Sequence, residues 1–216
     1  MLKQLKNALY FNVARYFAFF ARIRLARWQP RIVVITGSNG KTTALHMVEA
    51  RLGTRARYTH HRNSSFGIPF DLLGLGDATG SRLKWFALAV QAPFRAWREA
   101  PAEKIYVVEA DCDRPGEGKF LSELLKPEVV VWLNCARTHS AQFERVVRNK
   151  TFANVDDAIA HEYGFFLEHA NRLCILNSDD ERIMHEMERS RAKASTITER
   201  DLQSYGVLIE GTEFEL

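Results

Sequence analysis

Apolar residues recur every three or four positions through residues 1–30 of the chain. This spacing predicts an amphipathic helix over residues 2–28, with an apolar face made of Leu2, Leu5, Leu9, Val13, Phe17 and Phe20. Its longest uncharged stretch runs only from Asn7 to Ala14, far short of the ~20 residues that a bilayer span requires. Two interpretations stay open: the helix lies on an anionic membrane surface, or it packs on the following domain or on a partner chain.

From Arg31 onward, short uninterrupted apolar runs replace the helical spacing. Such runs are typical of strands buried on both faces of a parallel sheet; they cover residues 32–35, 105–108, 129–133 and 173–176. Helical spacing returns between them, through Leu45, Val48 and Leu52 up to Gly53, a suitable helix C-cap. We therefore expect an α/β fold, with a mostly parallel sheet flanked by helices and preceded by the N-terminal helix.

The charge distribution excludes one class of function. The net charge is +4, yet residues 1–31 hold seven basic residues and the chain has no acidic residue before Glu49, so the remainder carries −3. A nucleic-acid-binding domain is expected to spread basic residues over a folded face, and we predict no nucleic-acid partner. Three cysteines without a CxxC pair indicate buried, reduced thiols in a cytosolic protein, rather than disulfides or a zinc site.

A glycine-rich segment, Thr36-Gly37-Ser38-Asn39-Gly40-Lys41-Thr42-Thr43, joins the first apolar run to the helical pattern. Strand, glycine-rich turn and helix together are the context of a P-loop, whose backbone amides form a concave anion site. Lys41 is expected to reach the β- and γ-phosphates, and the Thr42 hydroxyl to ligate Mg²⁺. The predicted ATP-binding residues in this segment are Gly37, Ser38, Asn39, Gly40, Lys41, Thr42 and Thr43.

The first glycine of the general P-loop pattern would fall at Ile35. Without it, the segment resembles the ATP loop of the Mur ligase superfamily, whose members build the peptidoglycan stem peptide or extend folate with glutamate. Further segments resemble the family's motifs in order, and residues 63–70 look like the branch that adds D-alanyl-D-alanine, the MurF-like branch. The others are residues 109–117, 134–139 and 177–180, followed by a closing hairpin in residues 205–214. Taken without the family, Gly67 and Pro69 indicate only a turn.

The resemblance covers residues 31–216 and implies a central ATP-binding domain with defined roles. Glu109 would bind Mg²⁺, which agrees with its place at the carboxyl end of a predicted strand; Asp111 is a second candidate there. His139 would contribute to a second metal site, and Asn177 would meet the adenine edge. The resemblance thus implies Lys41, Glu109 and His139 as catalytic residues, Thr42, Glu109 and His139 as metal ligands, and ATP and Mg²⁺ as cofactors.

Three departures from the family pattern change this picture. The family's helix carries a lysine that is carbamylated in the active enzyme, and residues 159–165 place Tyr163 at that position. Glu162, beside it, and Lys150, in the preceding loop, are the substitutes we consider. The family's N-terminal substrate domain and its C-terminal lid domain are both absent from the sequence.

The sequence therefore supports two hypotheses above a third. The first is the ATP-binding domain of an ATP-dependent amide ligase in peptidoglycan precursor synthesis, acting through an acyl phosphate and needing a separate chain for its C-terminal domain. The second is a non-catalytic or partner-dependent nucleotide-binding module, associated with a membrane through residues 2–28. An unrelated P-loop kinase or ATPase ranks last. We expect a cytoplasmic protein, peripheral to the inner face of the plasma membrane if residues 2–28 meet lipid.

Overall fold

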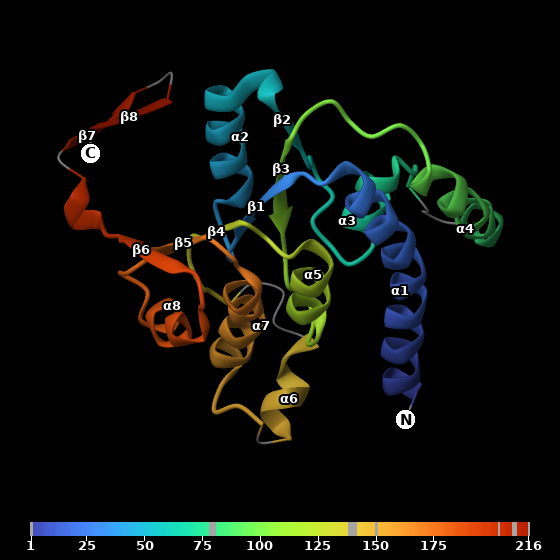
Figure 1. Ribbon diagram of the computed structural model, residues 1–216. Helices are drawn as coiled ribbons and strands as arrows, with labels where there is room; N and C mark the ends of the chain where they lie inside the picture. Colours follow the sequence, from blue (N-terminus) through green and yellow to red (C-terminus); the bar gives the residue numbers. More distant parts are fainter. Residues whose placement is uncertain are drawn as a thin grey trace.

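A six-stranded parallel sheet forms the centre of the protein in the computed structural model (Figure 1). The structure describes residues 2–77, 81–137, 142–149, 151–202, 204–208 and 211–215. Within them the strand order is β2-β3-β1-β4-β5-β6, all neighbours parallel. The strands are β1 Arg31–Thr36, β2 Ala56–Tyr58, β3 Ile105–Ala110, β4 Val129–Trp132, β5 Leu173–Asn177 and β6 Lys193–Ile197. The predicted α/β fold is confirmed.

Helices connect the strands, and a small hairpin follows the sheet. The α-helices are α1 Leu2–Trp28, α2 Lys41–Leu52, α3 Gly67–Leu73, α4 Arg82–Ala96, α5 Glu117–Leu125, α6 Glu144–Arg148, α7 Val155–His169 and α8 Glu181–Glu186. Short 3-10 turns are η1 Gly53–Arg55, η3 Met187–Arg189 and η4 Glu199–Asp201. The predicted closing hairpin is present as β7 Ser204–Leu208, antiparallel to β8 Gly211–Glu215.

Helices cover both faces of the sheet, which explains the uninterrupted apolar runs. Successive residues of a strand point to opposite faces. Ile35 packs with Leu45 of α2 in one cluster, whereas Ile32 and Val34 belong to the cluster that α5 and α7 complete. Figure 1 shows α2 on one side of the strands and α5 and α7 on the other.

The parallel register brings three strand ends to the same edge of the sheet. Ile35 of β1 pairs with Glu109 of β3, and Thr36 pairs with Ala110 of β3 and Trp132 of β4. The segments that follow β1, β3 and β4 therefore leave the sheet side by side. This edge is where an open α/β sheet binds its ligands.

The N-terminal helix packs against the rest of the protein through α3 and α4. Its buried stripe is formed by Ala14, Phe17, Ala18, Ala21 and Trp28, which keep the helical spacing. The predicted apolar face is partly wrong: Phe17 is buried, but Leu9 is 64% exposed. Leu2 and Leu5 lie in α1, but their side chains are outside the described part of the structure. Among the described residues, no helix is long and apolar enough to cross a bilayer.

Polar side chains of α1 bind backbone carbonyls of α4. The Tyr16 hydroxyl donates a hydrogen bond to the carbonyl oxygen of Ala89 over 2.8 Å. That carbonyl lacks its usual helical donor because the residue four positions later is Pro93, which has no N–H. Arg27 donates to the carbonyl of Ala96, the last residue of α4, and Arg24 donates to that of Arg98, two residues beyond the helix. The end of a helix leaves carbonyls unpaired, so α1 satisfies them.

We expect Tyr16→Phe to lower the free energy of unfolding by about 0.5–1 kcal/mol, because a helical carbonyl loses its donor. Urea denaturation of both proteins measures this difference. In a Pro93→Ala background an amide N–H returns to α4, and the same Tyr16→Phe change should cost less. An equal cost in both backgrounds would show that the proline is not the reason for the bond.

One local prediction is corrected by the structure. Gly67 and Pro69 indicated a turn, but both lie in α3. Proline is tolerated in the first turn of a helix, where the backbone N–H has no intrahelical acceptor.

Candidate functional site

The glycine-rich segment forms a tight loop between β1 and α2. Gly37 has φ +128°, and a Cβ there would lie 2.9 Å from the backbone oxygen of Asn134, so only glycine fits. Gly40 has φ +79° and precedes α2 without a side-chain cap. The first amides of a helix have no intrahelical acceptor. The start of α2 therefore offers its N–H groups and the positive end of its dipole to an anion.

Lys41 folds back into this loop. Its ammonium donates to the carbonyl oxygens of Gly37, over 2.6 Å, and Ser38, over 3.1 Å. The Asp111 carboxylate lies 3.1 Å from the same nitrogen. Lys41 is buried, with only 6% of its surface exposed. A buried cation thus stands inside the loop, held by neutral acceptors and one carboxylate.

Oxygen ligands meet at the ends of β1 and β3. The Thr42 hydroxyl donates to Glu109, lying 3.0 Å from Oε2 and 3.2 Å from Oε1. Glu109 is buried, and its backbone N–H donates to the Thr59 hydroxyl over 2.9 Å, which fixes the strand end. A hydroxyl and a carboxylate are hard oxygen donors of the kind that Mg²⁺ binds. The residues present therefore fit the predicted metal.

Tyr163 of α7 reaches the loop from the opposite side. Its hydroxyl lies 2.9 Å from Asp111 Oδ1 and 3.1 Å from the carbonyl oxygen of Gly37, and either oxygen can accept its proton. Burial raises the pKa of this phenol well above its usual value, and the Asp111 charge adds to the effect. Tyr163 is therefore a neutral donor that positions Asp111 beside Lys41.

The segment after β4 clamps the loop. Asn134 accepts from the Asn39 N–H through Oδ1 and donates through Nδ2 to the Asn39 carbonyl, at 2.9 and 3.0 Å. Ser38 donates its backbone N–H to the Asn134 carbonyl, and its hydroxyl exchanges hydrogen bonds with the backbone of Ala136. Asn134 carries no sequence signal of its own beyond its place directly after a buried strand.

Asn177 lines an apolar cavity of about 360 Å³ at the ends of β4, β5 and β6. Its amide side chain is already paired: Nδ2 donates to the Leu133 carbonyl, and Oδ1 accepts from the Asp179 N–H, each over 2.9 Å. Asn177 therefore ties β4 to β5. Leu133 lines the same cavity, and its side chain lies beside Gly40 of the loop. The cavity adjoins the loop.

Not every predicted site residue lies in this cluster. His139 and Lys150 fall outside the described residues. Thr43 is exposed on the first turn of α2. Glu162 does not substitute for the missing lysine: its carboxylate accepts from the backbone N–H groups of Gly116 and Gly118 at the start of α5.

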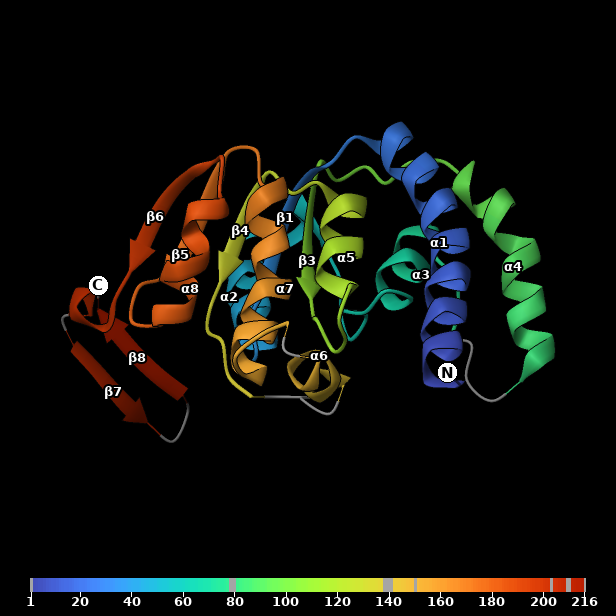
Figure 2. The same ribbon diagram turned by 90° about the horizontal axis from the view of Figure 1, so that it is seen from below.

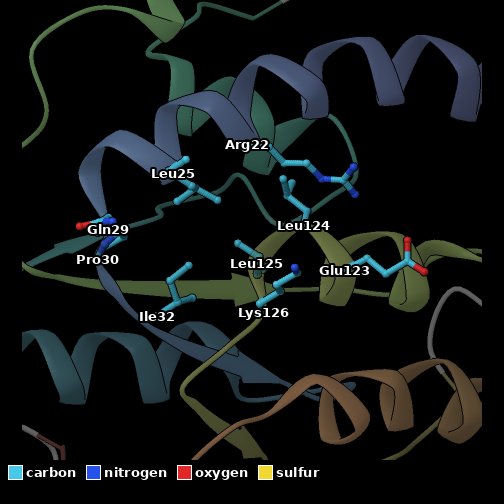
Figure 3. Close-up of a pocket in the computed structure, with 10 residues that line it drawn as sticks. Arg22, Leu25, Gln29, Pro30, Ile32, Glu123, Leu124, Leu125 and Lys126 are labelled. Atoms are coloured by element: carbon cyan, nitrogen blue, oxygen red, sulfur yellow. The ribbon is translucent and has the colours of Figure 1, made fainter.

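A cavity of about 580 Å³ between α1 and α5 lies apart from this site (Figure 3). Leu25 and Leu124 line it together with the charged side chains of Arg22, Glu123 and Lys126. None of these residues belongs to the loop or to the strand ends that face it. We assign this cavity no part in the candidate site.

The sheet, the loop between β1 and α2 and the acidic strand end define an α/β domain of the P-loop type. The particular family follows from comparison: the model of the Mur ligase middle domain matches residues 35–211. The chain belongs to that family. The resemblance predicted from the loop and the downstream motifs is thus confirmed.

Known relatives are ligases of the MurF type. The UDP-N-acetylmuramoyl-tripeptide–D-alanyl-D-alanine ligase of Bacillus subtilis (strain 168) is 28% identical over 124 residues, 55% of this chain and 21% of the relative. The enzyme of the same name from Borreliella burgdorferi is 25% identical over 138 residues, 62% of this chain and 25% of the relative. The chain thus aligns with about a quarter or less of these proteins.

Solved structures agree on the fold. MurF ligase from Thermotoga maritima in complex with ADP superposes with a TM-score of 0.68 at 20% identity, covering 93% of this chain and 41% of that one. MurF from Acinetobacter baumannii gives a TM-score of 0.65 at 18% identity, covering 94% and 41%. At these identities the likeness establishes the fold alone.

Proposed function

We propose that this chain is the ATP-binding part of a Mur-type amide ligase that acts in peptidoglycan precursor synthesis. One observation carries the proposal: the buried Lys41 ammonium inside the loop stands beside the facing Thr42 hydroxyl and Glu109 carboxylate. A phosphate chain needs a cation and backbone amides on one side and a metal ligand set on the other. The candidate site has these parts at the end of one sheet.

The reaction we propose is carboxylate activation followed by amide formation. A substrate carboxylate oxygen attacks the γ-phosphorus of ATP, which releases ADP and leaves an acyl phosphate. An amine then attacks the acyl carbon, the amide bond forms, and phosphate leaves with the amine's proton lost to solvent or base. Both steps need closed geometry that excludes water.

The chain's residues have distinct tasks in the first step. Lys41 and the amides at the start of α2 bind and orient the phosphates, so that charge on the departing phosphoryl group is neutralised. Thr42 and Glu109 would hold Mg²⁺, which supplies further positive charge to the phosphate oxygens when bound. Asp111, positioned by Tyr163, keeps Lys41 oriented in the loop.

The adenine base would occupy the apolar cavity that adjoins the loop. This cavity is lined by apolar side chains of β5, of β6 and of the segment after β4, among them Ile175, Ile197 and Leu133. Because the Asn177 amide already holds β4 to β5, we infer that Asn177 shapes the cavity and meets the adenine edge only through its free lone pairs.

Amide formation in the proposed reaction needs more of the ligase than the part that residues 1–216 match. The chain spans 41% of the length of the MurF structures that it matches. We propose that a separate chain, or a further segment of the same protein, supplies the closing C-terminal domain. The proposed location is the cytoplasm, at the inner face of the plasma membrane, where ATP is available.

The second candidate function is a nucleotide-binding module without ligase activity. Tyr163 favours it, because a neutral phenol stands where the family's carbamylated lysine belongs. The two candidates differ in one outcome. A ligase forms an amide once the closing domain is added, whereas a module binds ATP and releases no phosphate in any mixture.

Titration of Mg-ATP into the purified chain, followed by calorimetry with phosphate release measured in parallel, tests the proposal. We expect binding in the wild type, and a loss of about tenfold in affinity in Thr42→Val, since a metal ligand and its hydrogen bond disappear. Thr54→Val, an exposed threonine on η1, is the matched control. No binding by the wild type at millimolar ATP would contradict the proposal.

A further inference from the structure

Large apolar side chains are exposed along one face of α4. Leu83, Phe86, Val90 and Phe94 follow one another at helical spacing, and their exposed fractions run from 49% for Val90 to 80% for Leu83. Trp97, directly after the helix, is also exposed. The opposite face of the same helix, with Leu88, Ala92 and Ala96, is buried. The helix is thus apolar on two sides, and only one of them packs on the protein. Monomeric proteins seldom expose so much contiguous apolar surface without a use for it.

The exposed face lies at one end of the molecule. Figure 1 and Figure 2 both show α4 as the outermost element there, with α1 between it and the sheet. Tyr16 and Arg27 of α1 contact successive parts of α4, so the two helices run alongside each other. Leu9 and Phe19 of α1 are exposed as well. The two helices together hold six of the described large apolar residues that are more than 45% exposed, and Trp97 directly follows α4.

Charge on the helix that carries this face is of one sign. Between Asp77 and Glu99 the sequence has no acidic residue, and the basic residues in that interval are Arg82, Lys84, Arg95 and Arg98. On α1, Arg15 and Arg22 are exposed, and no acidic residue precedes Glu49. A protein partner would need an apolar groove ringed by acidic residues. An anionic bilayer offers an apolar interior beneath a negatively charged surface at every point.

We propose that the exposed face of α4 docks on the anionic surface of a lipid bilayer. The helix would lie in the plane of the interface, with Phe86 and Phe94 at the boundary between headgroups and acyl chains and the basic side chains at the headgroups. Aromatic side chains favour that depth. Fifteen residues are too few to span the bilayer, so the contact is peripheral.

This assigns different tasks to the two helices. Arg24 and Arg27 donate to carbonyls at and just beyond the end of α4, and the stripe around Phe17 is buried. The N-terminal helix therefore supports α4 and adds charge, while α4 makes the principal lipid contact. The docking face contains no residue of the loop or strand-end site, so it stands independently of the proposed ligase function.

Sedimentation with vesicles tests the proposal on the whole chain. We expect binding to vesicles of phosphatidylcholine mixed with phosphatidylglycerol, and much weaker binding to phosphatidylcholine alone. Phe86→Ser combined with Phe94→Ser should reduce binding to the mixed vesicles about tenfold or more, since two large side chains no longer enter the interface. The matched control is Met47→Ser, which removes a similarly exposed apolar side chain from α2. It should bind like the wild type.

A second pair tests the charge. Lys84→Glu with Arg98→Glu should weaken binding to the mixed vesicles, and the effect should shrink as salt is added. Circular dichroism and Mg-ATP titration of each variant verify that it is folded. If the wild-type chain does not sediment with the anionic vesicles, the proposal is overturned. The proposal also fails if the Phe86→Ser, Phe94→Ser variant binds the mixed vesicles as the wild type does. It fails as well if the variant's only change is that a dimer becomes a monomer.

Discussion

Lys41→Met is expected to lower the affinity of the chain for Mg-ATP by about a hundredfold, because a buried cation no longer faces the phosphates. The substitution keeps the length of the side chain and removes only its charge and donors. Lys41 is buried and lies within hydrogen-bond distance of two loop carbonyls. A cation from solvent therefore does not readily replace its ammonium group in the variant. Calorimetric titration of ATP measures the change.

Two further variants make this result specific. Lys119→Met, at an exposed position of α5, is the matched control and should bind ATP as the wild type does. Lys41→Met also leaves the Asp111 carboxylate without its counter-ion, which is expected to lower stability. Adding Asp111→Asn should recover the unfolding midpoint but not the affinity. If Lys41→Met bound ATP normally, the loop would not be the phosphate site.

Gly118→Ala is expected to destabilise the protein by about 3 kcal/mol, at the upper end of what overpacking usually costs. A Cβ at Gly118 would lie 1.9 Å from the carbonyl oxygen of Glu162, so α5 and α7 must separate to admit it. The same movement would break the hydrogen bond from the Gly118 N–H to the Glu162 carboxylate, now 2.9 Å long. Urea denaturation measures the loss.

Gly76→Ala is the control for this result. A Cβ at Gly76 meets nothing within 4 Å, so the substitution should leave the midpoint nearly unchanged. Equal midpoints for Gly118→Ala and the wild type would mean that α5 and α7 do not pack as closely as the structure has them.

Elements with one clear local signal could be predicted from the sequence. The run from Ile32 to Ile35, followed by Gly37, Gly40 and Lys41, gave β1, the loop and α2 in the right order. In β6 every residue from Lys193 to Ile197 is exposed, so no apolar pattern marks that strand. In α4 the exposed Phe86 and the buried Leu88 lie on opposite faces. Because apolar residues occupy both faces, the sequence of this segment lacks the hydrophobic periodicity that predicts an amphipathic helix.

The partners of the site residues depend on tertiary packing and could not be predicted. The resemblance predicts Tyr163 at the family's lysine position, and the structure places its hydroxyl near Asp111, 52 positions away in the chain. Asn134 clamps a loop residue 95 positions earlier. Glu162 was a candidate for the metal site, but the approach of α5 to α7 gives its carboxylate two amides instead.

The phenol of Tyr163 also makes this part of the site independent of dissolved carbon dioxide. A lysine carbamate forms from an amine and dissolved carbon dioxide, so it is present only while that gas is supplied, and it carries a negative charge. Tyr163 is neutral and buried, and hydrogen bonds to Asp111 and Gly37 hold it in place. This corner of the loop is therefore complete as soon as the chain has folded, and its charge is the same whether bicarbonate is scarce or abundant.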